Sequence, residues 1–189
     1  DGQPPEWQRA RDCKVSPLVA TLASLAFVVP VGGGLYALFS QRPSWSAPVV
    51  QSDTPGPLGL LALFLAGIIL HELIHGLTWS LVSGRRGLVK YGVNWAALMP
   101  YAHAREPLTA RVYRIGAAMP GLLLGLLPAA VGILSGHGLT FYFGLMLTVA
   151  AGGDMLILWL LRGTRPNSLV LDHPTRPGCL VLDEPPGPG

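Results

Sequence analysis

Charged residues are scarce in this sequence. Asp, Glu, Lys and Arg together make up 12% of its 189 residues, whereas half of the residues are hydrophobic. So low a charged fraction, together with a positive mean hydropathy, predicts an integral membrane protein in contact with the lipid bilayer. The net charge of +3 comes from Lys and Arg clustered in particular loops, and it gives no argument for a nucleic-acid partner.

Cysteine is almost absent as well. Cys13 and Cys179 lie in the two polar ends, and neither belongs to a C-x-x-C pair. A disulfide framework and a cysteine zinc site are therefore both unexpected. The polar first residues contain no pattern of a cleavable signal peptide. We expect one domain, a polytopic membrane domain that covers residues 1–189.

Long apolar runs, in contrast, are abundant. Crossing a hydrocarbon core about 30 Å thick takes about 20 apolar residues in a helix. Four runs meet this requirement, and they cover residues 18–39, 58–82, 108–134 and 139–161. Pro120 and Pro128 predict that the third helix bends. The expected fold class is therefore an all-α integral membrane protein with four transmembrane helices.

Two polar segments show a different pattern. Residues 85–107 contain β-branched and aromatic residues on both sides of turn signals, which predicts a small β-hairpin from 88–95 and 98–104 at the cytoplasmic surface. The tail, residues 162–189, repeats L-V-L-D at 169–172 and 180–183, which predicts two short strands.

Lys and Arg alternate along the chain in a way that predicts its orientation. The N-terminal segment has three and the loop between the first two apolar runs has one. Residues 85–111 have five, the turn before the fourth run has none, and the tail has three. Positive residues collect on the cytoplasmic side. We therefore expect a multi-pass protein of the cell membrane with both termini and the middle loop in the cytoplasm.

The second apolar run contains the sequence I-L-H-E-L-I-H-G-L at residues 69–77. His71, Glu72 and His75 are the only ionisable residues between positions 55 and 83. On a helix the two His share a face and can bind one zinc ion, while the carboxylate beside them can take a proton from water. Chance would produce H-E-x-x-H in roughly 0.3% of sequences of this composition. The sequence predicts His71 and His75 as zinc ligands and Glu72 as general base, with a proton relay or packing as the alternative.

Asp154 is the only residue of the fourth apolar run that is charged in water at neutral pH, and we expect it to be the third zinc ligand. Asp154 and His75 each lie eight residues before the cytoplasmic end of their helices. At about 1.5 Å per residue, both are roughly 12 Å from that surface. Gly152 and Gly153 are expected to let the two backbones approach. Pairing of Asp154 with another polar group, or its protonation, is the alternative.

Together, H-E-L-I-H at 71–75 and G-G-D at 152–154 resemble the site-2 protease group of intramembrane zinc metalloproteases. The chain is more closely similar to a compact bacterial family of membrane zincins over residues 18–183, to which P-Y-A-H at 100–103 and D-H-P at 172–174 are also similar.

This resemblance implies that zinc is held by His71, His75 and Asp154 and that Glu72 is the base. The site-2 aspartate motif N-x-x-P-x-x-x-L-D-G is absent, however, and A-A-G-G-D-M-L stands in its place. There is also no PDZ-like insert to select substrates.

The first hypothesis for function is a zinc-dependent endopeptidase that cuts membrane proteins or peptides within or just beneath the bilayer. The substrate must unwind first, and an edge strand from residues 88–104 would hold it extended by β-augmentation. His103 or Asn94 would stabilise the oxyanion, although a structural or surface role is favoured for both.

The alternative is a non-enzymatic membrane protein that binds zinc or protons, or an inactive protease-like binding module. Glu72 favours the enzyme, because a binding site does not need a general base. His137 and His173 are expected to be solvated and not to be ligands. Asp172, Asp183 and Glu184 are expected to be ordinary polar positions.

Overall fold

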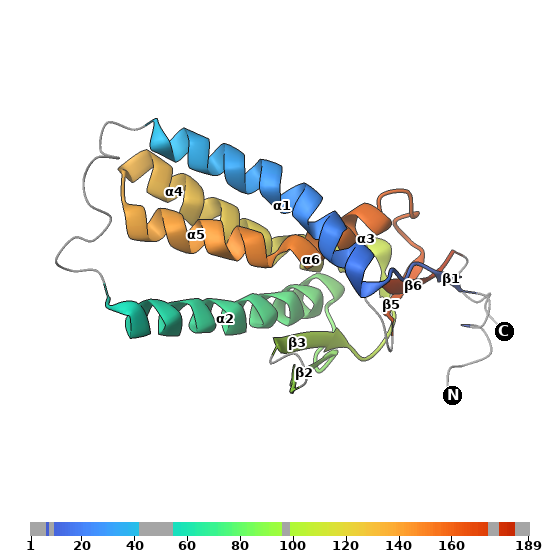
Figure 1. Ribbon diagram of the computed structural model, residues 1–189. Coiled ribbons are helices and arrows are strands. Elements are labelled where there is room, and N and C mark those ends of the chain that lie inside the picture. Colours follow the sequence, from blue (N-terminus) through green and yellow to red (C-terminus); the bar gives the residue numbers. More distant parts are fainter. Residues whose placement is uncertain (1–6, 8–9, 42–54, 96–98, 174–177, 184–189) are drawn as a thin grey trace.

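The computed structural model describes residues 7, 10–41, 55–95, 99–173 and 178–183 of the chain. Helices lie side by side along most of its length, and two small sheets lie at one end (Figure 1). The first two helices are α1, Pro17–Ser40, and α2, Pro57–Ser83. The helices predicted over residues 18–39 and 58–82 are therefore confirmed to within one residue at each end.

The third predicted span is a helix with a change of winding inside it. It consists of α3, Ala110–Pro120, a π-helical segment η3, Gly121–Leu126, and α4, Leu127–Ser135. Proline lacks an N–H and its ring clashes with the carbonyl four residues earlier, so a wider turn relieves the conflict. Pro120 and Pro128 were predicted to bend this helix, and the structure has a π-helical segment between them.

The fourth predicted span is broken, and its prediction as one continuous helix was wrong. Helix α5 is Gly138–Ala150, helix α6 is Gly152–Leu160, and the two are bent by 44°. Adjacent glycines weaken a helix, and an aspartate is favoured in a first turn, where it faces free N–H groups. Gly152 and Gly153 followed by Asp154 therefore favour a helix end and a new start at this point.

Three helical segments of the described chain are long and apolar enough to cross a membrane, namely residues 17–40, 57–83 and 110–135. The bent pair α5 and α6 makes a fourth if it is counted as one span. The mostly helical fold is thus confirmed, and three or four of its helical segments could span a membrane.

Helix α2 is apolar over most of its surface, but its buried face carries glycine, histidine and tryptophan instead of leucine. The residues at a spacing of four are Gly67, His71, His75 and Trp79, and all four are buried. Leucines such as Leu65, 52% exposed, face outward. This is the arrangement expected in lipid, where small and polar side chains face neighbouring helices.

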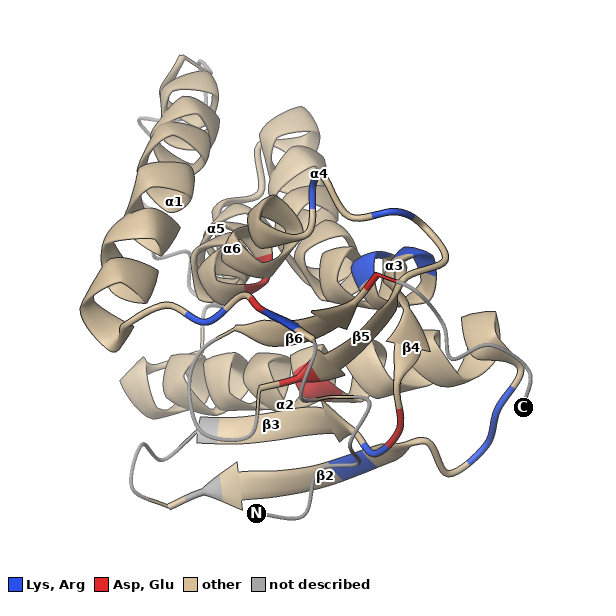
Figure 2. Ribbon diagram, turned by 90° about the vertical axis from the view of Figure 1, so that its right-hand side faces the viewer, with Lys and Arg blue, Asp and Glu red and all other residues tan. Residues whose placement is uncertain are grey.

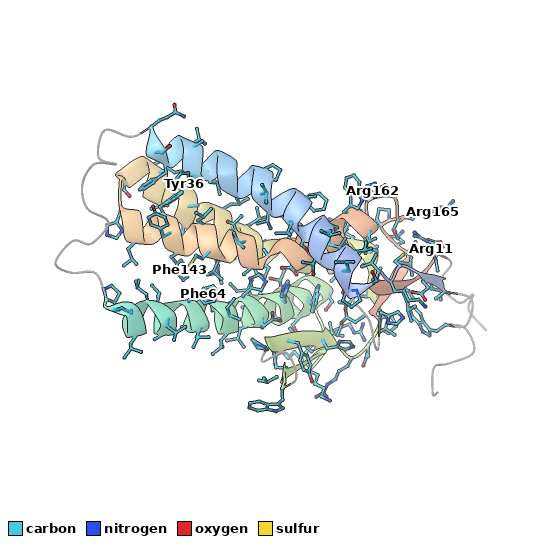
Figure 3. The ribbon with its side chains drawn as sticks, viewed as in Figure 1. Arg11, Tyr36, Phe64, Phe143, Arg162 and Arg165 are labelled. Atoms are coloured by element: carbon cyan, nitrogen blue, oxygen red, sulfur yellow. The ribbon has the colours of Figure 1, made fainter. Side chains whose placement is uncertain are left out.

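Gly67 packs against the side chains of Phe143 and Leu147 of α5. Figure 3 shows Phe64 of α2 and Phe143 of α5 between these two helices. A Cβ on Gly67 would come within 3.0 Å of the Phe143 ring, so glycine allows the close approach.

Two antiparallel sheets lie at one end of the helices, as Figure 2 shows from that side. The hairpin pairs β2, Val89–Asn94, with β3, Met99–Ala104, and confirms the predicted 88–104 hairpin. The second sheet has the order β1-β6-β5-β4. Its strands are β1, Arg11–Asp12, β4, Leu108–Thr109, β5, Leu169–Asp172, and β6, Cys179–Leu182.

The second sheet contains the two predicted tail strands and adds two that the sequence analysis missed. Strands β1 and β4 have only two residues each, which is too short for any periodic pattern. Pairing of β1 with β6 also brings the two cysteines together, since the Cys13 N–H donates to the Cys179 carbonyl at 2.9 Å.

Candidate active site

The buried face of α2 presents two imidazoles to the helices beside it. His71 and His75 are one turn apart, their ring centroids are 4.9 Å apart, and their side chains are each 7% exposed. Asp154, in the first turn of α6, faces both rings. Its Oδ2 lies 2.9 Å from Nε2 of His71, and its Oδ1 lies 3.3 Å from Nε2 of His75. The two Nε2 atoms thus converge on one carboxylate.

The His75 ring is oriented by a contact with α3 and by a contact within α2. Its Nδ1 lies 2.9 Å from the Gly116 carbonyl oxygen, which can only accept, so Nδ1 carries the proton. The Trp79 indole stacks on the imidazole with ring centroids 5.5 Å apart and donates to the Tyr113 carbonyl at 3.2 Å. Fixing the proton on Nδ1 leaves the Nε2 lone pair free for a metal.

Glu72 is positioned by the hairpin. Its Oε2 accepts a hydrogen bond of 2.7 Å from the Ala102 N–H of β3. Ligand atoms of His71, Glu72 and His75 all lie within 4.8 Å of one another, so the carboxylate is beside the imidazoles. Asp154 makes the closer contact with the two rings, whereas Glu72 is directed toward β3.

A groove runs between α2 and the hairpin beside Glu72. Its volume is about 370 Å³. Its lining includes Ile69, Glu72 and Leu73 from α2 and Tyr91, Val93 and Tyr101 from the hairpin. Burial and the nearby Glu72 charge raise the pKa of the Tyr91 phenol, so this ring lines the groove in its neutral form. An apolar wall with one carboxylate is suited to hold an apolar peptide segment.

The role expected for the two glycines before Asp154 was wrong. A Cβ on Gly152 would meet Val28 and Ser24 of α1, and a Cβ on Gly153 would meet nothing within 4 Å. Neither residue therefore mediates an approach of α6 to α2. The glycine that matters near the imidazoles is Gly116, because the Trp79 ring occupies the space that a Cβ would need.

The donor set fits zinc. Two imidazole Nε2 atoms and one carboxylate are a common ligand set of catalytic zinc sites. With zinc–ligand distances of about 2.1 Å, ligand atoms of a tetrahedral site lie roughly 3.4 Å apart. The Asp154 oxygens lie slightly inside that separation from His71 and His75. The carboxylate is thus close to both imidazoles at a separation near that of zinc ligands.

The remaining polar candidates fall outside this group. His103 is on β3 and its side chain is 42% exposed. In the hairpin, His103 pairs with Lys90, and the neighbouring Ala102 pairs with Tyr91. Because successive side chains of a strand point to opposite faces, His103 lies on the face of the hairpin opposite Tyr91. The side chain of Asn94 lies outside the described part of the structure. His137 is exposed and caps α5 by accepting from the Thr140 N–H, which agrees with a role outside the metal site.

His173 is not solvated, and Asp172 is not an ordinary polar position, so both expectations were wrong. The side chain of His173 is only 10% exposed and lies 3.8 Å from Asp12. Asp172 is 15% exposed and lies 3.3 Å from Nδ1 of His103. Two segments noted in the sequence, 100–103 and 172–173, therefore meet in space.

The groups that orient the site were not predicted from the sequence. Trp79 continues the spacing of four after His71 and His75, so the helical period could have indicated it. The Gly116 carbonyl and the Ala102 N–H are backbone groups, and no side-chain pattern identifies them.

Comparison with known proteins agrees with this geometry. A family model described as "Putative zincin peptidase" matches residues 64–169, which is more than half of the chain and includes most of α2, the hairpin and Asp154. No curated protein and no solved structure matches the chain. The chain therefore belongs to the family described as "Putative zincin peptidase".

Proposed function

We propose that this protein is a zinc-dependent endopeptidase that hydrolyses peptide bonds of membrane proteins or peptides, within or just beneath the bilayer. The observation that carries the proposal is the convergence of His71 and His75 on the Asp154 carboxylate, with Glu72 beside them. Membership of the zincin peptidase family supports the same chemistry. The apolar helices support a substrate that is itself associated with the membrane.

In this proposal His71, His75 and Asp154 hold the metal and Glu72 is the general base. Zinc, when bound, supplies Lewis acidity toward a scissile carbonyl and toward water. Glu72 is assigned the base because its oxygen is held by Ala102 of the hairpin, at the groove, whereas Asp154 contacts both imidazoles directly.

Glu72 would take a proton from the attacking water and later deliver it to the leaving amine. The Gly116 carbonyl keeps the His75 proton on Nδ1 throughout, so the ring stays in one tautomer. An unwound substrate segment would lie in the groove along the hairpin, since a helical segment hides its amide bonds.

The test is Glu72→Gln, measured with purified protein and a panel of single-span membrane peptides in lipid vesicles. The amide keeps the size of the side chain but cannot accept the proton, so turnover should fall by about 10²- to 10⁴-fold. Zinc content, measured by elemental analysis, should equal that of wild type. Glu106→Gln is the matched control, because Glu106 is exposed and pairs with Arg85.

Turnover by Glu72→Gln close to that of wild type would contradict the proposed mechanism. Zinc bound by a wild-type protein that cleaves none of the peptides would instead support a membrane zinc-binding protein.

A further inference from the structure

Asp172, at the end of β5, is a nearly buried carboxylate outside the group just described. The Tyr113 hydroxyl of α3 donates to its Oδ1, and the Ala104 N–H of β3 donates to its Oδ2 at 3.1 Å. Oδ2 also lies 3.3 Å from Nδ1 of His103. Both oxygens are therefore engaged, and the side chain connects β5, β3 and α3.

The backbone N–H groups on one edge of β3 bind two carboxylates, of which Asp172 is one. Ala102 and Ala104 are two residues apart, so their N–H groups point to the same edge, the one that does not pair with β2. Ala102 donates to Glu72 of α2, and Ala104 donates to Asp172 of β5. Strand β3 is thus fixed at two neighbouring backbone donors by carboxylates from two other elements.

Asp172 also reaches the part of α3 that orients His75. Tyr113 lies three residues before Gly116, and its own carbonyl accepts from the Trp79 indole. The turn of α3 that holds His75 therefore also donates to Asp172. In this way one side chain sets the position of β3, and with it of Ala102, relative to the imidazoles.

We propose that Asp172 is a positioning residue for the peptidase reaction, because it fixes β3 so that the Ala102 N–H holds the Glu72 carboxylate where it transfers protons. The inference rests on the proposed function. Asp172 bonds directly to β3, which holds Glu72, but it is linked to His75 only through the backbone of α3. Its main effect is therefore expected on the base and not on the metal.

Asp172→Asn tests this with almost no change of shape. The carboxylate uses a different oxygen for each donor. A neutral amide has only one acceptor oxygen, so at least one of these two charge-assisted hydrogen bonds is lost, and where that oxygen faces Ala104, Tyr113 can keep a contact only by accepting from the amide NH2. We expect kcat to fall by about 10- to 100-fold, the size usual for groups that orient a reacting side chain. KM should stay within about twofold, and zinc content should be unchanged.

The control is Asp183→Asn just beyond β6, because Asp183 is 54% exposed and contacts Arg11 and Ser168. It should match wild type in kcat, KM and zinc content. Loss of zinc from Asp172→Asn, or an unchanged kcat, would overturn the assignment.

A double variant separates positioning of the base from general damage to the fold. If Asp172 acts through Glu72, Asp172→Asn should cause no further loss of turnover in a protein that already carries Glu72→Gln. An equal loss in both backgrounds would mean a merely structural role and would overturn the proposal.

Amide hydrogen exchange gives a measurement independent of activity. In Asp172→Asn the β3 segment, residues 99–104, should exchange faster, while α2 keeps its protection. Unchanged exchange in β3 would refute the positioning role. Failure of the proposed function has another signature, because wild type and Glu72→Gln would then show the same turnover.

Discussion

The imidazole of His75 donates through Nδ1 to the carbonyl oxygen of Gly116, 2.9 Å away on the facing helix. Gly116 also lacks the Cβ that would collide with the indole of Trp79, the ring that stacks on His75. One glycine therefore supplies the acceptor that fixes the imidazole tautomer and the space for the ring that fixes its plane.

The first prediction follows from this contact. Gly116→Ala should move Trp79 and the carbonyl away from His75 and lower zinc affinity by about 10- to 100-fold, as loss of a group that orients a ligand usually does. Competition with a chelator of known affinity measures the change. Gly33→Ala in α1 is the control, since its Cβ would meet nothing within 4 Å. Equal zinc affinity in both variants would remove the role given to Gly116.

The second prediction concerns Asp154. Asp154→Ala removes the carboxylate that faces both imidazoles, so zinc content should fall together with turnover. His103→Ala should retain zinc, because His103 lies on the hairpin face directed away from α2. Elemental analysis of the two purified variants measures this difference. Full zinc occupancy in Asp154→Ala would mean that another residue is the third ligand.

The third prediction is the orientation in the membrane. The sheets at one end of the helices include β1, β5 and β6, and the turn between α4 and α5 lies at the other end (Figure 1). Because Lys and Arg collect near the sheets, we expect this end in the cytoplasm. Reporter fusions after Gly136 should be active on the outer side, and fusions after Asp183 on the inner side. The reverse pattern would refute the orientation.

The fourth prediction uses the cysteine pair. Burial, with Cys13 alongside, raises the pKa of the Cys179 thiol from 9.0 to about 12. The folded state therefore keeps a proton that the unfolded state releases above about pH 9. This contribution to stability is complete below that pH and is lost as the pH rises toward 12. The denaturant midpoint should therefore be lower at about pH 10 than at pH 8, and this decrease should be larger in wild type than in Cys179→Ala.

Alkylation is a second test of the buried, protonated state of Cys179. Because the thiolate is the reactive form, a maleimide at pH 8 should label Cys13 in the folded protein and Cys179 only after unfolding. Equal labelling rates in the folded protein would contradict the buried, protonated state of Cys179.

Much of the fold followed from the sequence because membrane helices and hairpins have local signatures. Helices α1 and α2 and the β2–β3 hairpin were predicted almost to the residue from apolar length and turn residues. The break before α6 was missed, because an apolar run does not show that glycines and an aspartate favour a new helix start over continuation.

The sequence by itself determined the chemistry of the proposed site. Spacing of four placed His71 and His75 on one face of a helix, and equal depth placed Asp154 at their level. Only the tertiary structure decided what surrounds these side chains: Gly116 behind His75, Ala102 on Glu72, and Asp172 between two strands and a helix. Backbone donors and acceptors are identical at almost every residue, so their use depends on which elements meet in space.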